Sequence, residues 1–384
     1  MSDKRMQKLG AGAIVVVGFC LLAGIFYFAL RNENPAHRDF IEYWAAERLY
    51  LAHQNPYDPE AVFQMERAGG LDRPTPEVAF CTPVLLFAQM PLGMMSPQTG
   101  LLLWTLLLFV CLALSLWLLW RLLGRRDHLL ILLGFTFAPA ISCLQAGQLG
   151  IFFLLAVTLF LTLRRSYPLL AGLALTPCVL KPHLFLPIFV VLVLWQIENR
   201  SVRVLAGFAL GVAGNLALTL AYAPRVLAQY LAFVGSTHMA GMFVPTLGSA
   251  LQQLVAPGSG WLELVPALCA AGWAAWFFRH NRARWQWMQH GMPVLLVCLV
   301  TAPYAFFTDE TLLLPAVMAA LFAAIDHKRS LVPIALVGGA ALAESLASVQ
   351  IMSLWFLWTP LAWLGWYLYA TGAFGKTAGE VAAP

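Results

Sequence analysis

Long apolar segments alternate with short polar ones along most of this chain. The apolar residues form blocks and do not recur at the spacing of a half-buried helix or strand. A helix that crosses a bilayer needs about twenty consecutive apolar residues. We therefore predict an all-α integral membrane protein, a polytopic bundle of about ten to twelve transmembrane helices. The candidate spans are 9–30, 99–122, 129–144, 148–163, 168–181, 183–197, 202–222, 260–278, 290–306, 311–325, 331–349 and 352–370.

Composition excludes a soluble globular domain. Of the 384 residues, 61% are hydrophobic and only 11% are charged, and the mean hydropathy is +0.76. Soluble domains carry about 25% charged residues. The blocks form one continuous unit, so we predict a single membrane domain over 1–384.

Basic residues set the expected orientation. With the N-terminus inside and strict alternation, five basic loops fall on the inner side, as the positive-inside rule requires. Segment 9–30 follows a basic start, is longer than a signal-peptide core and lacks a clear cleavage site, which indicates an uncleaved first span. The C-terminus is then also inside. The five loops are RLLGRRDH (121–128), RR (164–165), ENRSVR (198–203), RHNRAR (279–284) and DHKR (326–329).

Two apolar segments do not fit as simple spans. Residues 80–95 are interrupted by Pro83 and Pro91, and residues 243–255 are short. Counting 80–95 as a span would move the loop 121–128 to the outer side. We therefore expect re-entrant or interfacial elements at both places.

The outer face holds one long polar loop, residues 31–79. It contains nine of the eighteen acidic residues of the chain. Long loops in compact proteins are often functional. Within it, 38–52 is predicted as a helix lying at the membrane surface, between Asn34-Pro35 and Asn55-Pro56, and Asp58 is predicted to cap a second helix.

The helix 38–52 carries the first candidate chemistry. Asp39, Tyr43 and Glu47 share one helical stripe with Tyr50, and Glu42 lies one turn from Asp39. A carboxylate at the membrane surface can act as general base on a hydroxyl. The alternative is that Asp39 caps the helix or pairs with Arg38, while Glu42 and Glu47 form a solvated face.

Polar residues also gather at the expected outer ends of later spans. Lys181 stands in apolar surroundings, where a lysine binds a phosphate as a point charge or snorkels to the interface. Asp309 and Glu310 could contact a sugar or cap the helix beginning at Thr311. The candidate substrate-binding residues are Glu42, Tyr43, Gln148, Lys181, His183, Tyr304, Asp309 and Glu310, with His238 a weaker one.

Sequence motifs for other chemistries are missing. The chain has no Walker A loop, GxGxxG fingerprint, HExxH helix or GxSxG elbow. Its seven cysteines are scattered singly, with no zinc-ligand spacing. We therefore expect no metal site, no cofactor and no nucleic-acid partner.

Several stretches together resemble glycosyltransferase family 87. Its members are polytopic GT-C-class enzymes that use polyprenyl-phosphate sugars, and mannosyltransferases are the best known. The Asp39–Tyr43–Asn55-Pro56-Tyr57-Asp58 pattern and the Leu-Lys-Pro element at 180–182 are the most specific parts. The similar stretches are DFIEYWAAERLYLAHQNPYDPE (39–60), TPVLLFAQMPLGMMSPQTGLLLW (82–104), QAGQLGIFFLLA (145–156), LAGLALTPCVLKPHLFLP (170–187) and DETLLLPAVMAAL (309–321).

The resemblance implies a reaction. The family's acidic residue in the first outer loop is the catalytic base, and Asp39 matches it. Lys181, with His183, would offset charge on the donor phosphate, and the configuration would invert. Some members carry histidines where this chain has Thr308-Asp309-Glu310. The expected partners are a polyprenyl-phosphate sugar, a lipid or glycan acceptor and the bilayer.

The implied location is a bacterial inner membrane, with the active site facing the periplasm. The competing class is a transporter or lipid flippase without covalent chemistry. Charged residues in mid-span and inverted repeats would favour a transporter. Few charges lie in mid-span, and no repeat is detectable.

Overall fold

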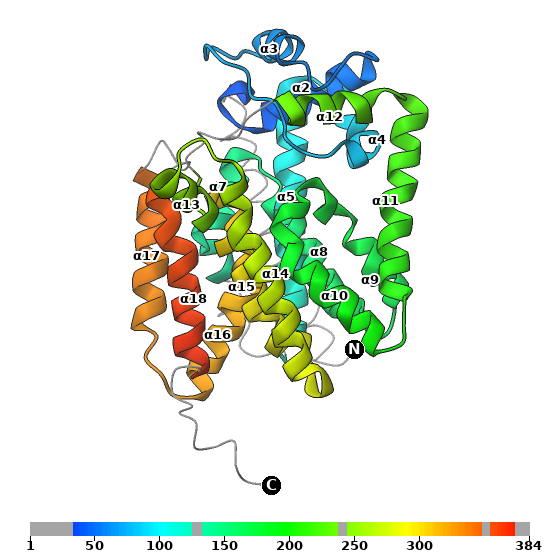
Figure 1. The fold of residues 1–384 in the computed structure, drawn as a ribbon. Coiled ribbons are helices and arrows are strands. Elements are labelled where there is room, and N and C mark those ends of the chain that lie inside the picture. The colour runs from blue at the N-terminus through cyan, green and yellow to red at the C-terminus, as the bar shows by residue number, and fades with distance from the viewer. Residues whose placement is uncertain (1–33, 125–132, 237–243, 348–353, 373–384) are drawn as a thin grey trace, which may run out of the picture. The chain divides into compact units, whose positions relative to one another are not determined.

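The computed structural model describes residues 34–124, 133–236, 244–347 and 354–372. The predicted first span, 9–30, His238 and the end of the C-terminal tail lie outside these residues. Every regular element in the described ranges is helical (Figure 1). The α-helices are α2 (Phe40–Leu51), α3 (Pro59–Ala68), α4 (Leu86–Gly93), α5 (Pro97–Leu122), α7 (Ala138–Ala146), α8 (Gly150–Leu163), α9 (Pro168–Ala174), α10 (Leu186–Glu198), α11 (Arg203–Tyr222), α12 (Val226–Ser236), α13 (Leu247–Val255), α14 (Trp261–Asn281), α15 (Met292–Thr301), α16 (Leu314–Asp326), α17 (Val332–Ala347) and α18 (Trp358–Thr371).

Short 3-10 segments link several of these helices, and one turn is a π-helix, η7 (Trp287–Gly291). Proline starts many of the segments, because its fixed φ suits the first helical position and its missing N–H costs nothing there. The 3-10 segments are η1 (Pro35–His37), η2 (Pro83–Leu85), η3 (Leu133–Thr136), η4 (Thr176–Leu180), η5 (Pro182–Phe185), η6 (Arg282–Arg284), η8 (Phe307–Leu313) and η9 (Leu354–Leu357).

In the described residues, four helices are long and apolar enough to cross a membrane, and seven further apolar helices are shorter. The predicted all-α, polytopic membrane class is thereby confirmed, whereas the count of ten to twelve spans stays a prediction. The described part of the expected span 129–144, residues 133–144, and the expected span 168–181 appear as short helices and 3-10 turns, because prolines and glycines interrupt them. The four long helices are Pro97–Leu122, Arg203–Tyr222, Trp261–Arg284 and Phe307–Asp326.

Contacts divide the chain into two compact units. Unit 1 comprises 1–79 and 89–109, and unit 2 comprises 80–88 and 110–384. Each unit is described on its own below. The single membrane domain over 1–384 stays a prediction.

Unit 1 confirms the two predicted helices of the outer loop. The side chain of Asn34 accepts a hydrogen bond from the Ala36 N–H at 3.1 Å and starts η1. The Asp58 carboxylate accepts one from the Glu60 N–H at 3.1 Å and caps α3. Both are ordinary N-cap interactions, which leave fewer helix-terminal N–H groups without an acceptor.

Helix α2 is packed inside its unit, with nine of its twelve residues buried. The Trp44 indole N–H donates to the Met95 carbonyl at 3.0 Å, and the Arg48 guanidinium donates to the Gly93 carbonyl at 2.9 Å. A Cβ at Gly93 would lie 2.6 Å from the Glu47 carbonyl carbon, so glycine permits this close approach. The N-terminal loop is therefore anchored to the segment that leads into α5.

In unit 2, glycines bring α9 and α11 together (Figure 1). A Cβ at Gly172 of α9 would overlap the Val204 carbonyl oxygen, and one at Gly207 of α11 would overlap the Leu169 carbonyl oxygen. Gly207 and Gly211 have the small-xxx-small spacing that lets membrane helices approach closely. Helix α10 packs against α14, and α16 packs against α18.

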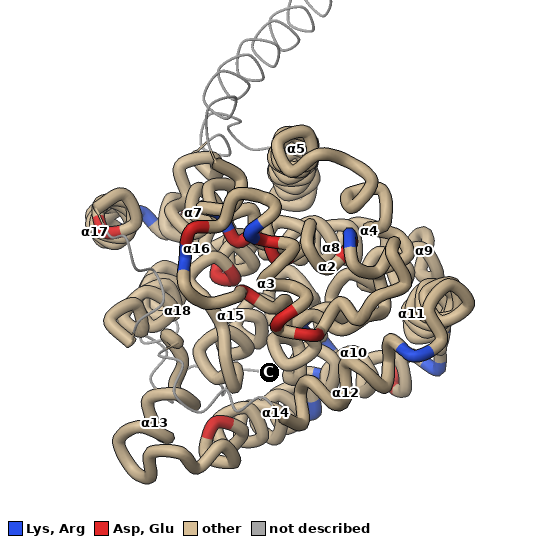
Figure 2. The backbone as a smooth tube through the Cα atoms, turned by 90° about the horizontal axis from the view of Figure 1, so that it is seen from above, with Lys and Arg blue, Asp and Glu red and all other residues tan. Residues whose placement is uncertain are grey.

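Charged residues are sparse along the backbone. Figure 2 shows them as short interruptions in a chain of otherwise uncharged residues. Large apolar side chains such as Leu210, Leu218 and Leu268 are 50–62% exposed. This pattern fits helices whose outer surfaces face lipid.

The α9–α11 contact gives a stability test. Gly207→Ala should separate the two helices and lower the free energy of unfolding by about 1–3 kcal/mol. Gly214→Ala, on the same helix, is the matched control, because a Cβ there has no neighbour within 4 Å. Thermal unfolding of both variants in detergent would measure the difference, and equal stability would contradict the close-packing account.

Candidate functional site

The most buried ion pair described in unit 2 joins two predicted site residues. The Lys181 ammonium lies 2.9 Å from Oδ1 and 3.0 Å from Oδ2 of Asp309, and the two side chains are 5% and 0% exposed. The Phe306 ring lies 5.0 Å from the ammonium. A charge is very costly to bury alone, so each of these two groups requires the other.

Non-helical turns hold this pair in place. Lys181 stands between η4 and η5, where Pro177 and Pro182 interrupt helix formation. The Asp309 Oδ2 also accepts a hydrogen bond from the Phe306 N–H at 3.0 Å, at the start of η8. Asp309 therefore pairs with Lys181 and also accepts the N–H at the start of its own turn. This turn begins at Phe307, earlier than the helix start predicted at Thr311.

A tight turn between α7 and α8 packs on the same region. Gly147 ends α7 with a φ of 78°, a left-handed conformation that glycine adopts readily. The following Gln148 is buried, and its N–H donates to the Cys143 carbonyl at 3.1 Å. A Cβ at Gly150 would overlap the Thr308 carbonyl oxygen, next to Asp309. The first turn of α8 thus lies directly against η8.

His183 and Tyr304 are also brought together. Their ring centroids lie 3.9 Å apart with an interplanar angle of 31°. The His183 Nε2 is buried and has no hydrogen-bond partner within the described ranges. A buried nitrogen of this kind can accept or donate a hydrogen bond when a ligand arrives.

Glu310 points to a different partner from that of Asp309. Its Oε1 accepts a hydrogen bond from the Thr359 hydroxyl of α18 at 2.6 Å. Its Oε2 is buried without a partner in the parts of the chain that are described. The two adjacent carboxylates of Asp309 and Glu310 therefore bind different partners. The contact of Glu310 with Thr359 was not predicted from the sequence.

Unit 1 contains the second group of candidate residues, around Asp39. Asp39 stands at the N-cap position of α2 and is half-buried, and its side chain makes no capping hydrogen bond. Its negative charge contributes to raising the pKa of Glu77. Capping by Asp39 is therefore wrong, and the other alternative, a pairing with Arg38, stays a prediction.

Arg73 binds this group of acidic residues and the backbone beside it. Its guanidinium binds the Glu77 carboxylate with both terminal nitrogens and donates to the Ala36 carbonyl at 3.2 Å. The Glu77 N–H in turn donates to the Glu66 carboxylate at 3.1 Å. Sequence reasoning missed these residues. Arg73 and Glu77 are four residues apart, but Pro74 and Pro76 between them exclude the helix on which that spacing indicates a contact.

Three other predictions for α2 have mixed outcomes. Tyr43 is buried with its ring 5.8 Å from that of Trp104. Glu42 is half-buried. The solvated face predicted for Glu47 is wrong: this side chain is 1% exposed, and burial raises its pKa well above the ordinary value. The pattern predicted a helix with one solvated face, and this prediction failed because other residues of the unit cover both sides of α2.

Breaking the buried pair gives the first site test. Lys181→Ala should leave the Asp309 charge buried without its cation and destabilise the protein by about 3–5 kcal/mol. The double variant Lys181→Met/Asp309→Leu removes both charges and should lose clearly less. Thermal unfolding in detergent measures both, and a double variant as unstable as Lys181→Ala would contradict the ion-pair account.

Glu66 gives a pH test. Burial raises its pKa to about 7. Between about pH 4.5 and 7 the folded protein therefore holds a proton that the unfolded chain has released, so stability falls as pH rises through this window. From pH 5 to 7 the loss should be on the order of 2 kcal/mol. Limited proteolysis of the loop 31–79 measures it, and Glu66→Gln should flatten the pH dependence.

The model of glycosyltransferase family 87 matches residues 81–303. That range includes Gln148, Lys181 and His183 and leaves Asp39 and Asp309 outside. No curated protein and no solved structure matches the chain. Because the match covers more than half of the 384 residues, it decides against the transporter alternative. The chain belongs to glycosyltransferase family 87 and is a membrane glycosyltransferase.

Proposed function

We propose that this enzyme moves a hexose, with mannose the first candidate, from a polyprenyl-phosphate donor to a hydroxyl of a lipid or glycan acceptor. The observation that carries the proposal is the state of Asp39. Its carboxylate stands at the start of a buried helix and does not cap that helix. Family 87 membership supplies the reaction class.

The surroundings of Asp39 suit a general base. Arg73 ties the chain at Ala36, three residues before Asp39, to Glu77. The backbone that carries Asp39 is thus fixed from both sides, by η1 and by α2. A base must be held within hydrogen-bond reach of the proton that it removes, so a fixed backbone around the carboxylate favours catalysis.

Lys181 is proposed to face the donor phosphate, with His183 beside it. Asp309 holds the ammonium in position through two contacts of 2.9 and 3.0 Å. An ammonium group carries three N–H donors. The phosphate that leaves from a monophosphate donor develops less charge than the diphosphate that leaves from a diphosphate donor. Lys181 then stabilises that charge in surroundings of low polarity, where such an interaction is strong.

In the proposed step, one bond to the anomeric carbon forms and one breaks. The acceptor oxygen attacks the anomeric carbon from the side opposite the phosphate, and a new C–O glycosidic bond forms. The bond between that carbon and the phosphate oxygen breaks, and its electron pair leaves with polyprenyl phosphate. Asp39 takes the hydroxyl proton. Attack from the opposite side inverts the anomeric configuration.

The active side is proposed to face the periplasm of a bacterial inner membrane. Three of the predicted inner loops support a common side. Arg282 lies 3.5 Å from Glu198, which joins the loops 279–284 and 198–203, and a pocket brings 164–165 to the latter. The Lys181–Asp309 pair lies near the opposite ends of α8 and α10.

Asp39→Asn tests the proposal directly. It keeps the size of the side chain but cannot take the acceptor proton at neutral pH, so turnover should fall by about 10²- to 10⁴-fold. Transfer from labelled polyprenyl-phosphate mannose to cell-envelope lipids, followed by product analysis, measures this. Donor binding should survive.

Matched controls separate catalysis from folding. Asp58→Asn removes an exposed capping carboxylate and should cost little activity, and Glu42→Gln should have a smaller effect than Asp39→Asn. Suppose that Asp39→Asn keeps near-normal turnover while a folded Asp309→Asn or Glu310→Gln variant has none. The base then belongs to the late turn, and the assignment to Asp39 is wrong.

A further inference from the structure

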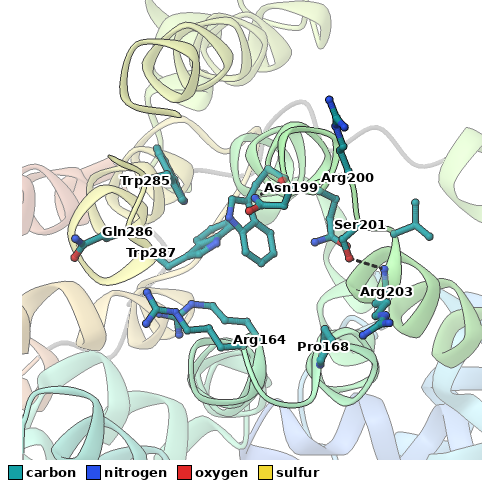
Figure 3. Close-up of a pocket in the computed structure, with 13 residues that line it drawn as sticks. Arg164, Pro168, Asn199, Arg200, Ser201, Arg203, Trp285, Gln286 and Trp287 are labelled. Atoms are coloured by element: carbon teal, nitrogen blue, oxygen red, sulfur yellow. Dashed lines mark hydrogen bonds between the residues drawn. The ribbon is translucent and has the colours of Figure 1, made fainter. Parts of the chain in front are cut away.

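A second polar region lies at the other ends of α8 and α10. Three segments of unit 2 surround a cavity of about 660 Å³ (Figure 3). They are the end of α8 with Arg164 and Arg165, the loop 195–203, and the turn 285–287. We call this cavity the basic pocket. Its size is within the range of small-molecule sites, about 300–1,000 Å³.

Positive charge is concentrated in the basic pocket. Arg164, Arg165, Arg200 and Arg203 line it, and none of them has a carboxylate partner in the described part of the chain. The three lining segments contain a single acidic residue, Glu198, which pairs with Arg282 at 3.5 Å. Burial and the adjacent Arg165 lower the pKa of Arg164 to about 10. An anion in the pocket would relieve this repulsion.

The walls supply further donors. Trp285 and Trp287 each have a buried indole N–H without an acceptor among the residues that the structure describes. Helix α11 begins at Arg203, so the positive end of a twenty-residue helix lies at the same pocket. The ends of α8 and α10 also lie at the pocket and place backbone carbonyl acceptors there, so the excess of positive charge comes from the four arginines. Arginines gathered around a cavity are typical of a phosphate site.

The loop that forms one wall is rigid. The Asn199 side chain donates to the Trp195 carbonyl at 2.7 Å, and the buried Gln196 accepts from the Val204 N–H at 3.0 Å. Arg200 takes a left-handed φ of 48° at the turn. In Figure 3 its side chain points away from the centre of the pocket, so Arg164 is the better contact.

Exposed apolar side chains occur next to the lining of the basic pocket. Val202, which lines it, is 70% exposed, and Tyr167 and Ile197, each adjacent in sequence to a lining residue, are 60% and 67% exposed. Tryptophans and exposed aliphatic side chains beside arginines are typical of the headgroup level of a membrane. The positive-inside rule explains arginines on this side of the bilayer, but not their convergence around a cavity walled by indoles.

We propose that the basic pocket binds the phosphate headgroup of an anionic membrane phospholipid, with the acyl chains lying on the exposed apolar side chains next to it. The arginines contact the phosphate, and the indoles and Val202 border the glycerol and the first methylene groups. Within unit 2 this site lies at the other ends of α8 and α10 from the Lys181–Asp309 pair, and it does not depend on the proposed donor.

Competition between two lipids tests the proposal. The purified full chain in detergent is given equal amounts of dioleoylphosphatidylglycerol and dioleoylphosphatidylcholine, and bound lipid is counted by native mass spectrometry. The wild-type chain should retain the anionic lipid preferentially. Arg164→Gln/Arg165→Gln should weaken that binding at least about tenfold. Arg164→Lys/Arg165→Lys, which keeps the charge, should lose less.

Two further variants keep the test decisive. Arg121→Gln removes one positive charge from the exposed end of α5, outside the pocket, and should bind as the wild type does. Val202→Asp puts a negative charge at an exposed lining position and should weaken binding even if the double glutamine variant fails to fold. Unchanged preference for the anionic lipid in Val202→Asp and in the folded double variant would overturn the proposal.

Soluble anions separate the possible sources of the phosphate. Inorganic phosphate and glycerol 3-phosphate are each added to the lipid-loaded chain. A lipid site should keep its lipid at millimolar concentrations of either anion, because the acyl contacts add to the affinity. Displacement of the lipid at concentrations similar to its own would show a pocket for soluble phosphates and would overturn the lipid assignment.

Discussion

The contact on which unit 2 depends is the buried pair of Lys181 and Asp309. It lies among helices whose side chains are almost entirely apolar, and its two charges are nearly removed from solvent. Such a pair contributes little to stability by itself, because desolvation offsets attraction. It imposes a strict geometric requirement instead. The turns η4, η5 and η8 must meet at one place, or two charges are left uncompensated.

The non-helical turns that meet at this ion pair can supply polar groups to a binding site between the helices. Backbone without helical hydrogen bonds is tolerated at membrane depth only where protein buries it or where it lines a cavity. Helix α8 has fourteen residues and rises about 21 Å, less than the bilayer core of about 30 Å. Helix α8 is therefore too short to cross the core by itself, and the turns at 145–150 and 302–313 supply polar groups at its start.

The sequence predicted the class of fold and several local details well. Apolar blocks predicted helices, and Asn34 and Asp58 were identified as helix starts because an N-cap depends on neighbours only. The pairing of Lys181 with Asp309 was not predicted, since 128 residues separate them. Periodicity gave the wrong environment for Glu47, because the cover over α2 comes from 93–104. Long-range contacts of this kind leave no trace in local pattern.

The two ends of α8 lie in two different polar regions. At its start, Gly150 allows contact with the backbone beside Asp309, and a carboxylate offsets the nearby ammonium. At its end, Arg164 and Arg165 meet the negative end of the helix dipole, yet no protein carboxylate in the described ranges offsets them. The first region is neutralised by the fold itself. The second has an excess of positive charge at headgroup level, which an anionic lipid can neutralise, so the bilayer itself would complete this end of the bundle.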